Sequence, residues 1–504
     1  MYLVGIDVGT GACKTLLFDL EGKALASASM EYPVRHPKPT WAEQDPEDWW
    51  RAVVHTLREV IKTSGVDPKD IAGISVDSQR EAVIPIDKEG RVLYQAIIWL
   101  DKRASPQVKV IRNRIPNEDV LRITGVKIDQ IFSAAKILWI KENMPKVFER
   151  TECFLCVKDF IIFRLTGEKV TDYSMASRTM LFDIHRKKWS SRICEVLDIP
   201  IEKLPPAFES SAVVGEITPE AAKLTGLKGG TPVVNGGGDR PCEALGAGVI
   251  DPGVVNAGTG TATVLTTPLT SPKVDPRGRI DCNFHVIPNT WEYEALINTT
   301  GASLRWFRDT FALREKELAE RSGVNVYDIL VKEAEKVDVG SDGLFFYPYL
   351  SGALLPFPDD RAKGSFYGIT LAHTKAHFIR AILEGVAFQY LGTMDILGEL
   401  GVTVAYLHLV GGEAKSDLWN QIKADVTGRE IRVPLVKDAA PLGAALLAGI
   451  GTGQYRDAKD AVEKAVKIEK VFKPDEKRHA KYLKVYKKYV NVYRVIMRTY
   501  DLVT

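Results

Sequence analysis

Two short glycine–threonine turns have a composition that suits phosphate binding. They are Asp7-Val-Gly-Thr-Gly-Ala near the N-terminus and Asn256-Ala-Gly-Thr-Gly-Thr in the second half of the chain. The backbone N–H groups of such a turn form a concave site for phosphate oxygens, and glycine lets the backbone approach a ligand closely. One such turn is equally consistent with an ordinary hairpin, but two in equivalent positions indicate a clamp for a polyphosphate.

Asp7 and Lys14 flank the first turn. A carboxylate beside phosphates would repel them, so Asp7 indicates a Mg²⁺ ion between the two, held mainly through water; a capping aspartate is the alternative. Lys14 offers a point charge to a transferring phosphoryl group, unless it is a solvated surface lysine. Residues 9–15 are not a P-loop, because Cys13 stands where a glycine is required and no helix follows.

Two further glycine loops carry polar residues. Asp239 follows Gly236, Gly237 and Gly238, and a carboxylate in such a loop can act as general base on a hydroxyl, although a turn aspartate is the alternative. The second loop, 411–416, precedes an expected helix. Its small residues can accept the flat face of a nucleobase and its N–H groups the phosphates, which is compatible with simple helix capping.

Arg80 and Glu81 follow a predicted buried strand. An adjacent donor and acceptor suit a polyhydroxylated substrate, although charges at a strand end also form surface pairs. Trp99 could place an apolar wall against a carbon chain, or be a core residue. These candidates need a scaffold that gathers several strand ends.

The order of the elements predicts such a scaffold. Strands are expected at 4–8, 15–20 and 24–33, which form an antiparallel meander, followed by a helix that begins at Asp45-Pro46 and by a buried strand at 71–76. A second round begins near 231, with strands on both sides of the second glycine–threonine turn. Two rounds of one arrangement predict an α/β protein with two homologous halves.

Helices are expected in five further stretches and in the tail. The tail, 475–500, has the pattern of a basic amphipathic helix that packs through one stripe. The other helices are expected at 303–311, 327–337, 377–398, 416–427 and 441–450.

The composition excludes several classes of protein. The 504 residues carry 67 basic and 65 acidic side chains, a net charge of +2, whereas nucleic-acid-binding proteins usually show a basic excess. Six cysteines are too few for a disulfide scaffold, and the isolated Cys153–Cys156 pair lacks the partners of a zinc site. No signal peptide and no membrane-spanning apolar run are present. We therefore expect a cytoplasmic enzyme.

The chain resembles the FGGY family of carbohydrate kinases along almost its whole length. The family's C-terminal signature is met at every constrained position in Gly364-Ser-Phe-Tyr-Gly-Ile, His377-Phe378 and Ala381-Ile-Leu-Glu-Gly385. The other signature is met at Ser133, Lys136, Trp139, Glu142 and Asn143, and departs at Ile131.

The resemblance implies an α/β fold of two actin/hexokinase/Hsp70-like (ribonuclease H-like) ATPase domains with an interdomain cleft. We expect a sugar-binding domain at 1–245 and a nucleotide-binding domain at 246–504. The resemblance further implies ATP, Mg²⁺ and transfer of the γ-phosphoryl group to a primary hydroxyl. Such a transfer has a loose transition state, so catalysis is mainly positioning and charge stabilisation.

Residue roles follow from the resemblance position by position. Asp239 corresponds to the catalytic base and Asp7 to the Mg²⁺-associated carboxylate. The expected nucleotide- and phosphate-binding residues are Thr10, Gly11, Lys14, Thr259, Gly301, Gly411, Gly412 and Lys415. The expected substrate residues are Arg80, Glu81, Trp99, Asp239 and Arg240.

The substrate is less defined within the family. Residues 78–81 and 176–182 resemble glycerol kinases, but those carry Tyr, Phe and Gln where this chain has Ile131, Ala262 and Arg240. The loss of those glycerol-kinase side chains opens the site and removes an apolar wall, which suits a substrate longer than glycerol. Xylulokinases usually show Met-His-Gly where Arg80-Glu81 stands, and autoinducer-2 kinases share Arg-Glu. We expect a linear ketose or polyol of pentose size, such as xylulose, with glycerol and the autoinducer as alternatives.

A different class stays open, because filament proteins, chaperones and non-catalytic sugar sensors use the same ATPase fold. Those proteins lack a substrate base, whereas Asp239 and the Arg80-Glu81 pair are both present here, which favours a kinase. The expected partner is a small sugar or polyol, with neither nucleic acid nor membrane, and the resemblance allows a homodimer.

Overall fold

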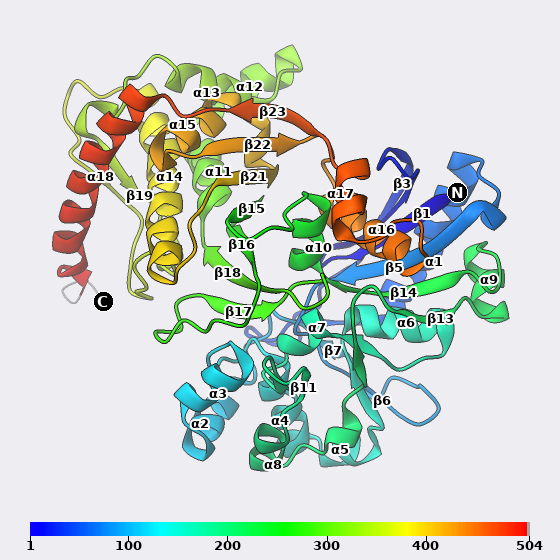
Figure 1. Cartoon of the computed structure of the whole chain (residues 1–504). Coiled ribbons are helices and arrows are strands. Elements are labelled where there is room, and N and C mark those ends of the chain that lie inside the picture. The colour runs from blue at the N-terminus through cyan, green and yellow to red at the C-terminus, as the bar shows by residue number, and fades with distance from the viewer. Residues whose placement is uncertain (501–504) are drawn as a thin grey trace. The chain divides into compact units, whose positions relative to one another are not determined.

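The computed structural model describes residues 1–500, which form two compact units. Unit 1 comprises residues 1–250, 268–293 and 438–467, and unit 2 comprises residues 251–267, 294–437 and the chain from 468 on. Neither unit is one continuous stretch of chain; in unit 1, for example, the orange segment 438–467 accompanies the blue strands of the N-terminal segment (Figure 1).

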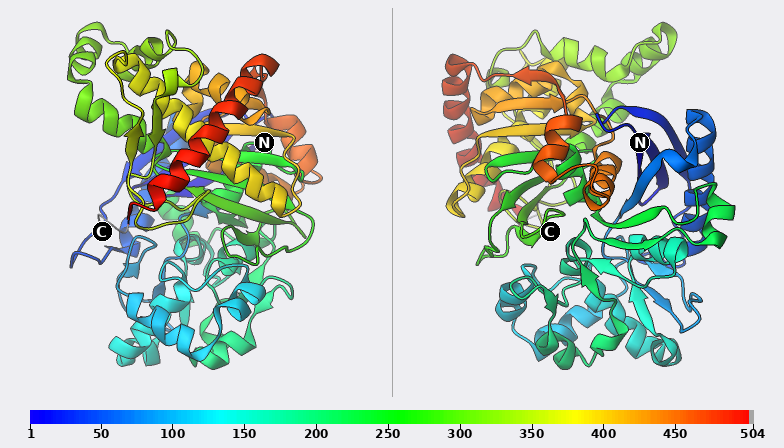
Figure 2. Two further views of the ribbon diagram at one scale, coloured as in Figure 1. Left: turned by 90° about the vertical axis from the view of Figure 1, so that its left-hand side faces the viewer. Right: turned by 45° about the vertical axis from the view of Figure 1, so that its right-hand side comes forward.

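Unit 1 is built on a six-stranded mixed sheet with the order β13-β14-β5-β1-β2-β3 (Figures 1 and 2). The strands are β1 (Tyr2–Val8), β2 (Ala12–Phe18), β3 (Ala24–Glu31), β5 (Ile71–Ser78), β13 (Val213–Glu216) and β14 (Pro232–Gly238). The predicted antiparallel meander of β1, β2 and β3 is confirmed, and β5 lies parallel to both β1 and β14. The carboxyl ends of β1, β5 and β14 therefore lie at one edge of the sheet.

Helices cover both faces of this sheet. They are α1 (Pro46–Ser64), α6 (Val157–Thr166), α7 (Tyr173–Ser177), α9 (Pro219–Thr225), α10 (Asp239–Gly246), α16 (Ala439–Gly451) and α17 (Ala458–Ala465). On one face, Val4 and Ile6 share a core with Trp49 of α1. On the other face, a Cβ on Gly5 would lie 1.8 Å from the Pro441 carbonyl oxygen, so α16 can cross β1 only because that residue is glycine.

The start of α1 is the one the sequence predicts. Asp45 is the N-cap, its side chain accepts a hydrogen bond from the backbone N–H of Glu47, and Pro46 occupies the first helical position. Proline fits there because its missing N–H would have no partner inside the helix.

A mainly helical part of unit 1 has its own core, which includes Ile111, Val120, Leu138 and Ile193. Its helices are α2 (Ser105–Arg114), α3 (Asn117–Thr124), α4 (Ser133–Asn143), α5 (Pro145–Arg150) and α8 (Ser191–Leu197). Short strands pair around it as β4 (Glu43–Gln44) with β7 (Ala96–Ile97), β6 (Ile84–Ile86) with β8 (Cys153–Leu155), β9 (Thr171–Asp172) with β12 (Ala207–Phe208), and β10 (Phe182–Asp183) with β11 (Lys188–Trp189).

A second sheet has the order β17-β18-β16-β15-β21-β22-β23. Its strands are β15 (Val254–Thr259), β16 (Thr263–Leu269), β17 (Asp281–Phe284), β18 (Trp291–Ile297), β21 (Tyr406–Gly411), β22 (Glu430–Pro434) and β23 (Ile468–Phe472). β15 and β16 form the predicted hairpin around the second glycine–threonine turn, and β21 runs parallel to β15.

The helices expected from the sequence are all present within a few residues of the predicted ends, and the one expected at 441–450 is α16 of unit 1. Unit 2 contains the remaining helices. They are α11 (Thr300–Phe311), α12 (Leu313–Ser322), α13 (Val326–Ala334), α14 (Lys375–Glu399), α15 (Asp417–Thr427) and α18 (Glu476–Met497). A short strand pair, β19 (Phe345–Tyr347) and β20 (Ser365–Tyr367), completes the unit. The predicted stripe of α18 consists of Tyr482, Tyr489 and Tyr493, which are buried.

Two findings bear on the class of protein. Among residues 1–500, no helix is both long and apolar enough to cross a membrane. All six cysteines are buried and unpaired.

Candidate active site

Acidic residues gather where the parallel strands of unit 1 end. Asp7 in β1 lies opposite Asp77 in β5, and Gly238 at the end of β14 lies opposite Ser78, so Asp239 follows at the same edge. Sequence reasoning found Asp7 and Asp239 but missed Asp77. Its one signal was its position at the end of a buried strand, and only the register with β1 shows that it adjoins Asp7.

Asp239 does not lie in a glycine loop, which corrects the local expectation. The three glycines are the last residues of β14, and Asp239 is the first residue of α10. The glycines are needed for close approach: a Cβ on Gly238 would lie 2.4 Å from Cδ of Arg80. The Asp239 carboxylate therefore stands at the N-terminal end of α10.

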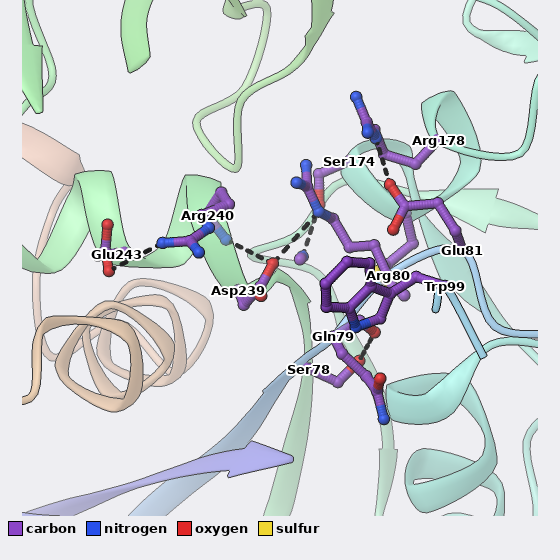
Figure 3. A network of polar contacts seen from close by, with 12 residues as sticks. Ser78, Gln79, Arg80, Glu81, Trp99, Ser174, Arg178, Asp239, Arg240 and Glu243 are labelled. Carbon is purple, nitrogen blue, oxygen red and sulfur yellow. Dashed lines mark hydrogen bonds and ion pairs between the residues drawn. The ribbon is translucent and has the colours of Figure 1, made fainter. Parts of the chain in front are cut away.

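Arg80 pairs with Asp239, and its neighbour Glu81 pairs with Arg178 (Figure 3). Arg80 Nε lies 3.2 Å from Asp239 Oδ1, and the arginine side chain is only 7% exposed whereas that of the aspartate is 34% exposed. The buried guanidinium therefore orients a carboxylate that a ligand can still reach.

Glu81 belongs to a second chain of charges. Its Oε1 lies 2.5 Å from Arg178 Nε, and Arg178 Nη1 lies 2.8 Å from Asp281 Oδ2. Glu81 has a left-handed backbone (φ 61°), and Lys136 Nζ donates a hydrogen bond to its carbonyl oxygen at 2.7 Å. Burial lowers the pKa of Lys136 to about 8. The expected adjacent pair is thus two separate ion pairs, because β5 ends at Ser78 and successive side chains diverge.

We expect Arg178→Met to lower the free energy of unfolding by about 3–5 kcal/mol, because it leaves Glu81 buried without its partner. The matched control is Arg186→Met, whose exposed pair with Asp183 should be worth less than about 1 kcal/mol. Urea unfolding of both variants measures the difference. Equal losses would show that the Glu81–Arg178 pair is not a buried electrostatic contact.

The first glycine–threonine turn is braced from within unit 1. Thr10 Oγ1 donates to Gln79 Oε1 at 3.1 Å and accepts from Trp99 Nε1 at 2.9 Å. Trp99 is 39% exposed, so it is not a core residue, and Figure 3 shows it beside Gln79 and Arg80. Gly11 lies at the exposed tip of the turn, where nothing would touch an added Cβ. The Thr10 hydroxyl is therefore already hydrogen-bonded, so the groups that the turn offers to a ligand are its backbone and the indole ring of Trp99.

Lys14 has a partner that sequence reasoning missed. Its Nζ lies 2.5 Å from Asp438 Oδ1, a residue 424 positions later, just before α16. Both side chains are about one-third exposed, at 35% each. The lysine can exchange this carboxylate for a phosphate of similar charge, since both accept from its ammonium group.

Asp7 is the candidate for an ion-associated carboxylate. Burial, followed by the charge of Asp239, raises the pKa of Asp7 to about 7, and burial likewise raises that of Asp77 well above its usual range. Within residues 1–500, no three His, Cys, Asp or Glu side chains are arranged to hold a metal. Asp7 and Asp77 are carboxylates, and Mg²⁺ is usually held by one or two carboxylates together with water and substrate phosphates.

We expect Asp7→Asn to stabilise the ligand-free protein more at high pH than at low pH. A carboxyl whose pKa is raised on folding contributes stability at low pH that is lost as pH rises through the folded value, here about 7. Asparagine stays neutral, so the gain in melting temperature over the natural protein should grow from about pH 4 to about pH 7 and then level off. Thermal unfolding in EDTA measures it, and a pH-independent difference would contradict the burial of a charged Asp7.

Unit 2 contains a pocket of about 340 Å³. The predicted residues Gly301, Gly412 and Lys415 line it. The other lining residues come mainly from the β15–β16 turn, α11, α13 and the start of α15; they are Gly260, Thr261, Leu304, Arg305, Asn325, Tyr327, Asp328, Val331, Glu413, Ser416 and Trp419. Sequence reasoning predicted these helices but not which of their side chains meet.

Thr259 and Gly411 build the wall of this pocket without being among its lining residues. Thr259 Oγ1 donates to the Val410 carbonyl at 2.6 Å and accepts from the Glu413 N–H at 3.1 Å. A Cβ on Gly411, which has φ 90°, would lie 2.0 Å from the Thr259 carbonyl oxygen. Because β15 and β21 are parallel neighbours, Thr259 and Gly411 lie directly opposite each other and tie the two glycine loops together.

A buried ion pair supports the pocket floor. Glu413 Oε2 lies 2.6 Å from Lys423 Nζ, and both side chains are buried. The carboxylate of Glu413 is therefore compensated from inside the unit. Two cations, Arg305 and Lys415, line the pocket, and Arg305 Nη2 donates a hydrogen bond to Thr261 Oγ1 at 2.7 Å.

Arg240 is the candidate substrate residue whose position differs most from the expectation. Its Nη1 lies 3.5 Å from Glu243 Oε2, one turn along α10. Figure 3 shows the side chain directed to Glu243 and away from Arg80. Arg240 therefore stands on the other side of Asp239 from the Arg80 and Glu81 pairs.

Comparisons with known proteins agree with this arrangement. Residues 2–246 match the family model described as FGGY family of carbohydrate kinases, N-terminal domain, and residues 253–452 match the C-terminal domain of that family. The xylulose kinase of Bacillus subtilis (strain 168) is 34% identical over 493 residues, which cover 98% of this chain and 96% of that protein.

A gluconokinase of the same organism is 32% identical over 500 residues, covering 99% of this chain and 97% of its own length. The crystal structure of xylulose kinase from Rhodospirillum rubrum matches with a TM-score of 0.91 and 30% identity, covering 99% of this chain and 100% of that one.

Both halves of the fold, the sites on them and these similarities lead to one assignment. The chain belongs to the FGGY family of carbohydrate kinases, has that family's two-domain α/β fold, and is an ATP-dependent sugar kinase.

Proposed function

We propose that this kinase transfers the γ-phosphoryl group of ATP to a primary hydroxyl of a linear ketopentose such as xylulose. The observation that carries the proposal is the reachable Asp239 carboxylate held by buried Arg80, with the Glu81–Arg178–Asp281 chain beside it. Alternating acceptors and donors suit successive hydroxyl groups, and the Trp99 face suits the carbon chain. The full-length similarity to xylulose kinases supports the same substrate class.

Asp239, the first residue of α10, acts as the general base that accepts the proton of the attacking hydroxyl. Arg80 orients this carboxylate, while Glu81, Trp99 and Arg240 contact the sugar. Asp7 would hold Mg²⁺ through water, and the ion when bound neutralises charge on the phosphates.

The nucleotide occupies the pocket of unit 2. Its phosphates meet the turn at Gly260 and the backbone at Gly301 and Gly412, and its base lies against the apolar side chains Leu304 and Trp419. Thr259 and Gly411 hold this wall, and Lys415 adds charge. In unit 1, Thr10, Gly11 and Lys14 would bind phosphate, for which Lys14 would leave Asp438.

The functional division that we propose is a sugar-binding domain at 1–245 and a nucleotide-binding domain at 246–504. We also propose that the enzyme works in the cytoplasm, where its co-substrate ATP is supplied, and that it forms a homodimer.

A sugar acid such as gluconate is the second candidate, which sequence reasoning did not consider. The observation in its favour is Arg240, the residue after the proposed base. The side chain of Arg240 is a cation and is 32% exposed. An arginine can hold a terminal carboxylate in a bidentate contact. The gluconokinase relative supports this alternative.

A substrate panel tests the proposal. ADP release would be measured with xylulose, ribulose, pentitols, glycerol, gluconate and the autoinducer precursor. We expect kcat/KM for a ketopentose to exceed that for glycerol and gluconate by at least about tenfold, roughly 1.4 kcal/mol of transition-state binding. A preference for gluconate would overturn the ketopentose assignment. If none of these compounds raised ADP release above the rate with water alone, the result would support a sugar sensor instead.

A further inference from the structure

A network of wholly buried polar groups lies behind the catalytic edge of unit 1, and nothing in the mechanism above uses it. At its centre is Lys158 of α6, whose Nζ lies 2.9 Å from Asp159 Oδ1, 3.3 Å from Asp172 Oδ1 and 3.2 Å from Asn235 Oδ1. All four side chains are buried. Burial lowers the pKa of Lys158, but Asp159 and Asp172 more than compensate and raise it above its usual value.

One arm of the network reaches the residue before the base. Asp172 Oδ2 accepts hydrogen bonds from the hydroxyls of Ser174, at 2.5 Å, and Ser210, at 2.8 Å. Ser174 Oγ in turn accepts a hydrogen bond from the backbone N–H of Gly238 at 2.9 Å. Since Ser174 donates its single proton to Asp172, its oxygen is oriented to accept from Gly238.

The other arm reaches the residue before Arg80. The backbone N–H of Lys158 donates to Ser78 Oγ at 3.1 Å, and that hydroxyl donates to the Gln79 carbonyl at 2.8 Å. Gly238 and Ser78 are also register partners in the parallel pair β14–β5. The network therefore anchors the two strand ends from which Asp239 and Arg80 project.

We infer that Ser174, held by Asp172 and Lys158, is a positioning residue that sets the Asp239 carboxylate against Arg80. Buried charges are costly unless fully paired, so the Lys158–Asp172 pair is held in one arrangement. The Ser174 hydroxyl, which is hydrogen-bonded to both Asp172 and the Gly238 N–H, fixes the position of Gly238 relative to that pair. The inference rests on the proposed role of Asp239. A displacement of the base by about 1 Å is enough to slow a positioned reaction by about a hundredfold.

The test compares Ser174→Ala with Ser210→Ala. Both remove one buried hydroxyl from the same carboxylate oxygen, but only Ser174 also accepts from Gly238. We expect Ser174→Ala to lower kcat at least about tenfold, with KM for ATP unchanged because the nucleotide pocket lies in unit 2, and Ser210→Ala to leave kcat within about twofold. Equal kcat values in the two variants would overturn the inference.

A third variant separates the hydrogen bond from packing. Ser174→Cys keeps a side chain in the space but offers only a weak acceptor, so we expect it to remain as slow as Ser174→Ala. A cysteine variant that turns over like the natural enzyme, beside a slow alanine variant, would show that volume and not the hydrogen bond matters, and would overturn the inference.

Hydrogen–deuterium exchange gives a readout that needs no sugar. In Ser174→Ala, the peptide that spans β14 and α10 should exchange at least about tenfold faster than in Ser210→Ala, because the Gly238 amide has lost its acceptor. Identical exchange would overturn the inference. A failure of the proposed function can be told apart from a failure of this inference. In that case the natural enzyme would not phosphorylate a sugar, while the difference in exchange between the two variants would persist.

Discussion

Sugar phosphorylation by the Asp239→Asn variant is expected to fall about a thousandfold in kcat, with binding of ADP unchanged. Asparagine keeps the size of the side chain at the start of α10 but cannot accept the proton of the attacking hydroxyl. It also leaves Arg80, 3.2 Å away and 7% exposed, without its carboxylate partner. Initial rates with saturating sugar and ATP, together with calorimetry for ADP, measure the two effects.

Glu243→Gln is the matched control for this variant. Glu243 is a carboxylate on the same helix, one turn further on, and its Oε2 lies 3.5 Å from Arg240 Nη1. Its neutralisation is expected to change kcat by no more than about threefold. If the Asp239 variant retained the activity of this control, Asp239 would not be the base.

Gly301→Ala is expected to weaken ATP binding by about 10- to 100-fold, while kcat at saturating ATP changes little. A Cβ at this position would lie 2.2 Å from the carbonyl oxygen of Gly260, in the turn that lines the same pocket. Because non-bonded heavy atoms do not approach each other so closely, the turn at Gly260 must shift. Overpacking of this kind costs about 1–3 kcal/mol, which the bound nucleotide would have to overcome.

The control for the glycine variant is Gly398→Ala near the end of α14. An added Cβ there would meet nothing within 4 Å, and alanine is the better helix former, so the KM for ATP should stay unchanged. The two variants would be compared by the KM for ATP and by the melting temperature. A Gly301 variant with the control's KM for ATP would place the nucleotide elsewhere.

Local patterns carried most of the information about the elements. The meander of β1, β2 and β3, the β15–β16 hairpin and the N-cap at Asp45 all follow from residues within a few positions of one another. Hairpins and caps are short-range structures, so their residues are close in any fold that contains them. The family signatures likewise identified a carbohydrate kinase.

The partners of the site residues could not be predicted in the same way. Lys14 meets Asp438 across 424 positions, Glu81 meets Arg178 across 97, and Arg80 turns to Asp239 instead of its own neighbour. These choices depend on which strands are neighbours and in which register. A shift of one residue in the register would direct Lys14 of β2 to the opposite face of the sheet, and a shift in β5 would displace the strand end that Arg80 and Glu81 follow.

By itself, the sequence determined the two glycine–threonine turns, the elements around them and membership of the FGGY family, and it predicted a carboxylate base at Asp239. Only the tertiary structure decided that Asp77 adjoins Asp7, that α13 lines the pocket of unit 2, and that buried Lys158 lies behind the strand ends that precede Asp239 and Arg80. The physical reason is that backbone conformation is encoded locally, whereas the pairing of buried charges is decided by long-range packing, where an unpaired charge is too costly to remain.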